Sequence, residues 1–134
     1  MSGYLADTSI FVAVEQRRAL SSPPSGDARI SVATLTELIV GVRRAGSGPL
    51  RTVREATLTR ARSFVAIPYD ELVAERLAEL LAEAREQGRR AGAMDAIVAA
   101  TALVHDLAVW SQDDDFDVLA QLAPDLRVHR GHRG

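Results

Sequence analysis

The chain has no cysteine and no lysine, few aromatic residues and no long uninterrupted hydrophobic run. The absence of cysteine excludes disulfides, thiolate metal ligands and cysteine nucleophiles, and it is compatible with a reducing compartment. Aromatic residues make up 4% of the 134 residues, whereas hydrophobic residues make up 47%. The core must therefore consist of Leu, Val, Ile and Ala, which is typical of helices packed on a sheet of aliphatic strands.

The longest apolar stretch, Ile97 to Trp110, is interrupted by His105 and Asp106 well short of a membrane span. The amino terminus lacks a basic region followed by a secretory core. These absences predict a soluble, cytoplasmic protein with no membrane partner. The length fits one compact domain, which we expect over residues 1–128, followed by a disordered tail at 129–134.

All 16 basic residues are arginine, and the net charge of −2 provides no globally basic field. The distribution of the charges is more informative than their sum. A region with Glu55 as its single acid contains six arginines: Arg43, Arg44, Arg51, Arg54, Arg60 and Arg62. Guanidinium groups suit phosphate better than ammonium groups do. The region is therefore a candidate RNA-binding face, although a solvated helical face explains the same charges equally well.

Short aliphatic strand patterns alternate with helical patterns along the chain. Strands are expected at residues 4–6, 29–32, 65–67, 107–110 and 126–128, and helices at 10–18, 35–42, 49–64, 70–87, 97–104 and 118–122. This alternation predicts an α/β fold, with a central parallel sheet of four to five strands and helices on both faces. Right-handed crossovers would bring the turns after the first and fourth strands to the same edge.

Acids stand where this scheme places the ends of strands and the starts of helices. At residues 4–9 an apolar run ends in Asp7 and two hydroxyls, and Asp7 alone is explained by capping of the next helix. Further acids recur in apolar settings or directly after a strand: Glu37, in the first turns of a helix capped by Thr34 or Thr36, then Asp95, and Asp113 with Asp115 close by. Capping does not account for four convergent carboxylates, and this edge is where open α/β folds bind ligands.

These acids form an all-oxygen set of donors. Mg²⁺ prefers carboxylates and water, and it keeps several waters for substrate and nucleophile. A cation held in this way can generate a hydroxide nucleophile and stabilise the leaving oxygen of a phosphodiester. The candidate metal ligands are Asp7, Glu37, Asp95, Asp113 and Asp115, with Ser9 acting through water. Ser9 and Ser111 lack a placed histidine base, which argues against a serine hydrolase.

The acidic run at residues 113–117 has two other interpretations. Acids in a first helical turn meet the positive end of the helix macrodipole, and some of these residues serve that role. The alternating aspartates also imitate a calcium loop. However, Val118 stands where that loop needs glycine and Pro124 where its closing glutamate belongs, so the calcium loop is rejected.

Four segments in combination resemble the motifs of the PIN-domain family, and their order and spacing are similar to those of VapC toxins from VapBC toxin–antitoxin systems. They are Asp7-Thr8-Ser9, Thr34-Leu35-Thr36-Glu37-Leu38, residues 95–102 and residues 111–116. Ser111 replaces the threonine that is commoner at the start of the last motif. The resemblance spans nearly the whole chain and leaves the acids intact.

This resemblance implies a PIN-like fold and a Mg²⁺- or Mn²⁺-dependent endoribonuclease that is usually dimeric. The catalytic and metal-binding acids carried over are Asp7, Glu37, Asp95 and Asp113, with Asp115 as a more peripheral fifth. Structured RNA, often tRNA, is the implied substrate. The implied partner is a VapB-type antitoxin that wraps the toxin and places a basic side chain in the acidic pocket.

Three alternatives differ in the residues they require. A Mg²⁺-binding signalling receiver domain needs paired acids after its first strand and a lysine, and this chain has no lysine. A phosphatase of the haloacid dehalogenase type needs a second aspartate where Ser9 stands. A non-catalytic domain that binds RNA or a partner has no such requirement, so an activity assay must decide that alternative.

Overall fold

The structure is a computed structural model that describes residues 3–130. Five strands form one parallel sheet in the order β3-β2-β1-β4-β5: β1 (Gly3–Ala6), β2 (Asp27–Ser31), β3 (Val65–Ile67), β4 (Ala108–Ser111) and β5 (Val128–Arg130). The helices are α1 (Thr8–Glu15), α2 (Val32–Arg44), α3 (Pro49–Ala61), α4 (Glu71–Glu86), α5 (Ala93–His105) and α6 (Asp117–Leu122). The α/β architecture predicted from the sequence is confirmed. Across residues 3–130, no helix has both the length and the hydropathy needed to cross a membrane.

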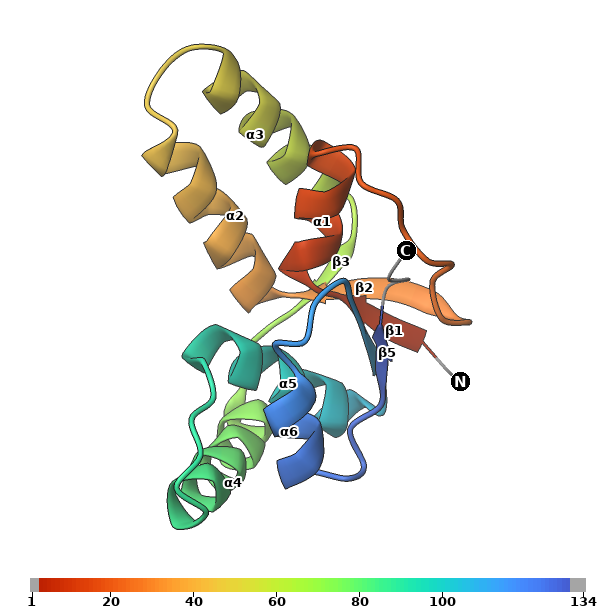
Figure 1. Cartoon of the computed structure of the whole chain (residues 1–134), viewed down its shortest axis with the longest axis vertical. Helices are drawn as coiled ribbons and strands as arrows, with labels where there is room; N and C mark the ends of the chain where they lie inside the picture. The colour runs from red at the N-terminus through yellow and green to blue at the C-terminus, as the bar shows by residue number, and fades with distance from the viewer. Residues whose placement is uncertain (1–2, 131–134) are drawn as a thin grey trace.

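Side-chain alternation along the strands explains why helices cover both faces of the sheet. In β1, Leu5 belongs to one hydrophobic core, whereas Tyr4 and Ala6 belong to the other. The Leu5 core is completed by α4, α5 and α6, and the second core by α1, α2 and α3 (Figure 1). Parallel strands are normally buried on both faces, as the central strands β1 and β4 are, whereas the edge strands β3 and β5 are partly exposed.

The strand order reverses direction at β1, next to the predicted site. The chain runs outward from β1 to β2 and β3, and then returns to place β4 and β5 on the other side of β1. Because the strands are parallel, their C-terminal ends lie at one edge. The crevice between the ends of β1 and β4 is a topological switch point, the usual position of a ligand site in such folds. The Asp7 N–H donates to Trp110 O across this crevice at 2.9 Å.

The start of α2 differs from the sequence-based expectation of a cap at Thr34 or Thr36. Ser31 is the N-cap, and its Oγ accepts a hydrogen bond from Ala33 N at 3.1 Å. The helix therefore begins directly at the end of β2, and Glu37 lies in its second turn. Thr34 is buried inside the helix instead of capping it.

The last strand also differs from the predicted edge strand at 126–128 and disordered tail at 129–134. β5 covers Val128–Arg130. His129 pairs with Trp110 of β4, and Arg130 pairs with Ser111. Backbone pairing with a buried strand orders this part of the chain. The prediction of a tail is therefore wrong for His129 and Arg130, and the rest of the predicted tail lies outside the described residues.

Candidate active site

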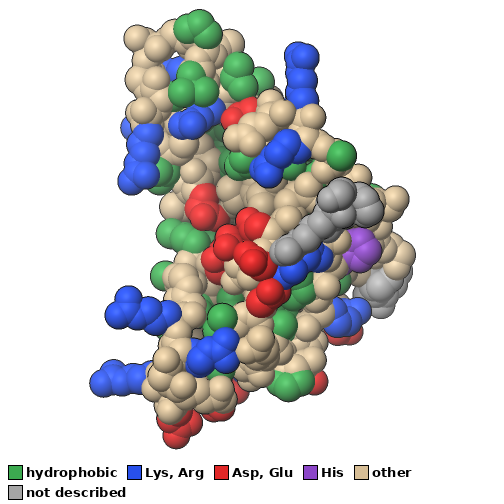
Figure 2. All heavy atoms as spheres, in the orientation of Figure 1, with side chains coloured by type: hydrophobic (Ala, Val, Ile, Leu, Met, Phe, Trp, Pro, Cys, Tyr) green, Lys and Arg blue, Asp and Glu red, His purple; other side chains and the backbone are tan. Residues whose placement is uncertain are grey.

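A cavity of about 220 Å³ opens at the C-terminal edge of the sheet. Figure 2 shows acidic side chains gathered in the middle of this face of the molecule. The cavity is lined by Asp7, Thr8, Ser9, Val12, Arg18, Glu37, Asp95, Asp113 and Asp115. The structure thus brings together every residue that the sequence predicts for the site.

Asp7 joins β1 to α1 and has both of the roles considered for it. It is the N-cap of α1, and its Oδ2 accepts a hydrogen bond from Ser9 N at 3.2 Å. It is also buried, with 3% of its surface exposed, at the base of the acidic cavity. The cap therefore holds a carboxylate in a fixed orientation at the switch point.

Hydroxyl groups link the ends of β1 and β4. Ser111 Oγ, fully buried, lies 3.4 Å from Asp7 Oδ2 and 3.2 Å from Asp113 Oδ1, and its single proton serves one carboxylate at a time. Ser9 Oγ lies 3.2 Å from Ser111 Oγ and accepts from Gln112 N at 2.9 Å. The sequence does not predict that these two serines link the two acids, because Ser9 and Ser111 are far apart in the chain.

Glu37 is held by Thr8, which is not among the site residues predicted from the sequence. Thr8 Oγ1 donates a hydrogen bond to Glu37 Oε1 at 2.6 Å, which joins the first turn of α1 to α2. The position of Thr8 next to Asp7 was the available signal. This contact fixes one oxygen of Glu37 at the wall of the cavity.

Three acids of the cavity, Asp7, Asp95 and Asp115, have a pKa above that of an isolated carboxylate. Burial is the main cause and raises the pKa of Asp7 to about 6. Burial, followed by the charges of Asp7, Asp115, Glu37 and Asp113, raises the pKa of Asp95 to about 7. Burial and then Asp113 raise the pKa of Asp115 as well. Like charges oppose one another here because the cavity has too little positive charge to balance them.

The side chains that line the acidic cavity offer the donor atoms that a divalent cation prefers, although their positions do not form a coordination site. Among residues 3–130, no group of three or more acidic or histidine side chains is arranged to hold a metal ion. The donors nevertheless comprise five carboxylates and two hydroxyls with no thiolate or imidazole, which matches the preference of a hard cation. Repulsion from the neighbouring acids contributes, after burial, to the raised pKa of Asp95, and a cation would relieve that repulsion. The chemistry of the donors therefore fits a hard divalent cation.

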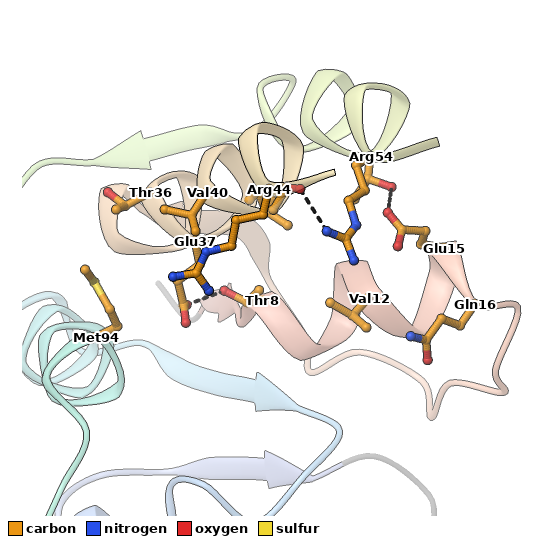
Figure 3. Close-up of a pocket in the computed structure, with 13 residues that line it drawn as sticks. Thr8, Val12, Glu15, Gln16, Thr36, Glu37, Val40, Arg44, Arg54 and Met94 are labelled. Atoms are coloured by element: carbon orange, nitrogen blue, oxygen red, sulfur yellow. Dashed lines mark hydrogen bonds between the residues drawn. The ribbon is translucent and has the colours of Figure 1, made fainter. Parts of the chain in front are cut away.

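A larger cavity of about 490 Å³ adjoins the acidic one and shares Thr8, Val12 and Glu37 with it. Figure 3 shows its walls, which come from α1, α2, α3 and the start of α5. In this view the Arg44 side chain extends toward Glu37 and Thr8. The acidic site therefore continues into a groove whose walls include Arg44 and Arg54.

The arginines of the candidate RNA-binding face differ in their structural roles. Arg54 Nη1 donates to Gly41 O at 2.8 Å, which holds α3 against α2. Arg51 pairs with Glu55 on the exposed surface of α3. Arg43 and Arg44 lie exposed in the last turn of α2, without an ion pair among the residues of the described chain. These two remain candidates for RNA contact, whereas Arg54 has a structural role.

A model of the PIN domain matches residues 4–122. Ribonuclease VapC5 of Mycobacterium tuberculosis is 39% identical over 114 residues, which cover 84% of this chain and 84% of that protein. Ribonuclease VapC4 of the same organism is 36% identical over 126 residues, covering 92% of this chain and 93% of that protein. The residues matched by the PIN-domain model include all four motifs that contain the acids.

Solved structures agree with these sequence relatives. A chain in the crystal structure of VapBC-5, a toxin–antitoxin system member from Mycobacterium tuberculosis, matches with a TM-score of 0.84 and 33% identity, covering 96% of this chain and 98% of that chain. A chain of VapBC2 from Rickettsia felis matches with a TM-score of 0.77 at 19% identity, which shows the fold alone. The resemblance carried by the four motifs is confirmed, and the chain belongs to the PIN-domain family, among relatives named VapC.

Proposed function

We propose that this chain is the toxin of a VapBC-type pair and acts as a Mg²⁺-dependent endoribonuclease, in which Mn²⁺ can substitute. The observation that carries the proposal is the convergence of five carboxylates on one cavity at the switch point of a PIN-type fold. Its relatives are named ribonucleases and resemble it over most of its length. The substrate is structured RNA, with tRNA as the first candidate.

The metal-binding residues in this proposal are Asp7, Glu37, Asp95 and Asp113, with Asp115 at the periphery. A divalent cation would supply Lewis-acid charge and activate the attacking water. Ser111 and Ser9 keep Asp7 and Asp113 in a fixed relation, because their hydroxyls bridge the two strand ends. Thr8 orients Glu37 through its hydrogen bond. Burial and the neighbouring acids raise the pKa of Asp95 to about 7, and positive charge entering the cavity would favour its charged form.

The proposed protein partners are a VapB-type antitoxin and a second copy of this chain. Solved relatives from Mycobacterium tuberculosis and Haemophilus influenzae are described as VapBC systems. A basic side chain of the antitoxin would neutralise the acids whose repulsion raises the pKa of Asp95. The larger cavity, with Val12, Val40 and Met94 in its walls, offers apolar surface beside that site.

The test is cleavage of a mixed RNA pool, including tRNA, by purified antitoxin-free protein. RNA ends are mapped with chelator, Mg²⁺ or Mn²⁺ present. Asp7→Asn keeps a good N-cap residue and the shape of the side chain but removes a charged ligand. We expect it to lower the cleavage rate by about 100-fold or more, since changes even outside the ligand shell of a metal cost roughly 10–100-fold.

Asp125→Asn is the control, because Asp125 is an exposed acid outside the acidic cavity. Circular dichroism of both variants checks that the fold is retained. Full cleavage by Asp7→Asn, or equal cleavage in chelator and in Mg²⁺, would contradict the metal-dependent mechanism. Failure of the wild-type protein to cut any RNA while it still binds RNA would favour the non-catalytic alternative.

A further inference from the structure

The turn after α1 adopts a conformation that residues with a side chain rarely take. Arg17 has a φ of 56°, in the left-handed region. Two hydrogen bonds close the turn: Arg17 N donates to Val14 O at 3.1 Å, and Arg18 N donates to Ala13 O at 2.8 Å. Helices usually end this way on glycine, because other residues are disfavoured there. The turn determines the direction in which Arg18 leaves the helix.

Residues 19–22 follow this turn and are called the strap, because side chains from the C-terminal part of the chain form hydrogen bonds with them. The strap has no regular secondary structure. Three contacts hold it: Gln112 Nε2 donates to Ala19 O at 2.9 Å, Trp110 Nε1 donates to Ser21 Oγ at 3.2 Å, and His129 Nε2 lies 2.8 Å from Ser22 O. These partners lie in β4, in β5 or directly after β4, at the edge that carries the acidic cavity. The strap is therefore fixed relative to the acids.

Arg18 lies between the turn and the strap, and it lines the acidic cavity together with five carboxylates. It is the one basic residue among the described residues that line this cavity. Arg18 is exposed, and none of the ion pairs within residues 3–130 includes it. A purely structural counterion would pair with one of the acids. The guanidinium instead keeps its donors available for a ligand.

An RNA phosphate that approaches this cavity meets the negative charge of the acids. A bound divalent cation offsets part of that charge, and a guanidinium on the wall adds a second attraction. The planar fork of arginine matches two oxygens of a phosphate group and makes charge-assisted hydrogen bonds with them. Arg44 lines the adjoining cavity, whereas Arg18 lines the acidic cavity itself.

We propose that Arg18 binds non-bridging oxygens of the RNA backbone next to the scissile bond, and that Gln112 is the positioning residue that holds Arg18 there through Ala19. The proposal deepens the proposed function and rests on it. It adds a substrate-binding residue, supplied by the turn after α1, to a site otherwise made of acids and hydroxyls.

The experiment compares Arg18→Ala and Arg18→Lys with Arg17→Asn. Arg17→Asn removes the same charge one residue away, and asparagine tolerates the left-handed turn. Arg17 does not line the cavity. We expect Arg18→Ala to lower kcat/KM for RNA cleavage in Mn²⁺ by about 10–100-fold, the range for hydrogen bonds to a charged group. Arg18→Lys should recover part of this loss, and Arg17→Asn should stay within about twofold of wild type.

Two further measurements separate substrate binding from a structural role. The rise in melting temperature on adding Mn²⁺ should be the same in Arg18→Ala as in wild type. In a double-mutant cycle, Gln112→Ala should lower kcat/KM in the wild-type background and change it little in the Arg18→Ala background, because both act on the same contact.

Unchanged or increased cleavage by Arg18→Ala would overturn the proposal, and an increase would identify Arg18 as an internal inhibitor. A lost Mn²⁺ response would also overturn it, because Arg18 would then support the metal site itself. Measuring the RNA affinity of the variants in chelator distinguishes an error in the role of Arg18 from an error in the proposed nuclease function. If the wild-type protein does not cut RNA, the assignment of Arg18 stands only when Arg18→Ala weakens RNA binding more than Arg17→Asn does.

Discussion

Asp95 holds its proton to higher pH than Asp7, although Asp7 is the more deeply buried of the two. Hydrogen bonds from Ser9 favour the charged form of Asp7 and oppose the effect of its burial. The causes that shift the pKa of Asp95 are burial and the charges of the other cavity acids, with no hydrogen bond among them for the described residues. The repulsion within the site therefore acts most strongly on Asp95.

This imbalance predicts how Asp95→Asn changes stability with pH. The folded pKa of Asp95, about 7, lies above the value of about 4 expected when the chain is unfolded. The protonated form thus favours folding, an effect that is complete below about pH 4 and is lost as the pH rises through the folded pKa. Asp95→Asn should raise the melting temperature of the metal-free protein by several degrees at pH 8, and by less at pH 5. Thermal melts in chelator at both pH values measure the difference.

The same variant should respond less than wild type to Mn²⁺. A cation that binds only the folded protein stabilises it by about 2.7 kcal/mol at 100 times its dissociation constant. Asp95→Asn weakens binding and therefore reduces the rise in melting temperature. Asp125→Asn, an exposed acid outside the cavity, is the control. Equal Mn²⁺ responses in wild type and Asp95→Asn would place Asp95 outside the metal site.

At the scale of elements, α1, α2 and α3 form the wall of the larger cavity and are joined by side-chain contacts. Arg54 of α3 donates to Gly41 O of α2, and Thr57 of α3 donates to Glu15 of α1 at 2.7 Å. Glycine in the interior of a helix lowers its stability relative to alanine. A substitution of Gly41 therefore tests whether this position needs glycine for the close approach of Arg54, or whether a residue with higher helix propensity stabilises α2.

We expect Gly41→Ala to stabilise the protein by about 0.5–1 kcal/mol. A Cβ at Gly41 would lie 3.8 Å from Arg54 Cδ, which is an ordinary contact. Gly3→Ala is the contrasting variant, because its Cβ would lie 3.0 Å from both Asp27 O and Leu107 Cδ2. That variant should lose stability. Urea unfolding of the two variants measures the effects, and a loss of stability in Gly41→Ala would show that Arg54 requires glycine beside it.

At the scale of the whole molecule, the charges are separated in space although their sum is −2. Acids line the cavity at the edge of the sheet, and Arg43 and Arg44 lie at the end of α2. RNA must therefore be attracted by surfaces around the cavity more than by the cavity itself. This separation predicts that RNA affinity depends on salt through a small number of arginines.

The double variant Arg43→Gln/Arg44→Gln should bind RNA more weakly and with a flatter dependence on salt. Each lost contact to an RNA phosphate reduces the slope of log K against log salt by roughly 0.7–0.9. Arg54 is left intact because it holds α3 to α2. Arg85→Gln, on α4 in the opposite helical layer, is the control. An unchanged slope in the double variant would move the RNA-binding face elsewhere, with Arg89 and Arg90 as the next candidates.

The local features of this fold could be predicted because they depend on neighbours in the sequence. Aliphatic runs predict the strands, and the alternation of strands with helices predicts a parallel sheet covered on both faces. Asp7 and Asp113 each follow a strand, and the ends of parallel strands share one edge. The convergence of the acids therefore follows from the order of the elements together with the rule for crossovers.

The exact ends of the elements were less predictable, because several residues can provide a cap or extend a strand. Thr34 and Thr36 are reasonable N-caps by residue type, yet Ser31 provides the cap because β2 ends there. His129 and Arg130 have no strong strand pattern, but they are ordered by pairing with β4. In both places a neighbouring strand decided between alternatives that local propensity left open.

The sequence by itself determined the class of fold, the family and the set of acids, because periodicity and motif spacing express these directly. The tertiary structure alone decided the contacts that give the acids their surroundings. Ser111 bridges Asp7 and Asp113, and Gln112 holds the strap that follows Arg18. These partners are far apart in the chain and come together only when β4 inserts beside β1. A short-range pattern contains no information about such pairs, since their contact depends on packing of the whole sheet.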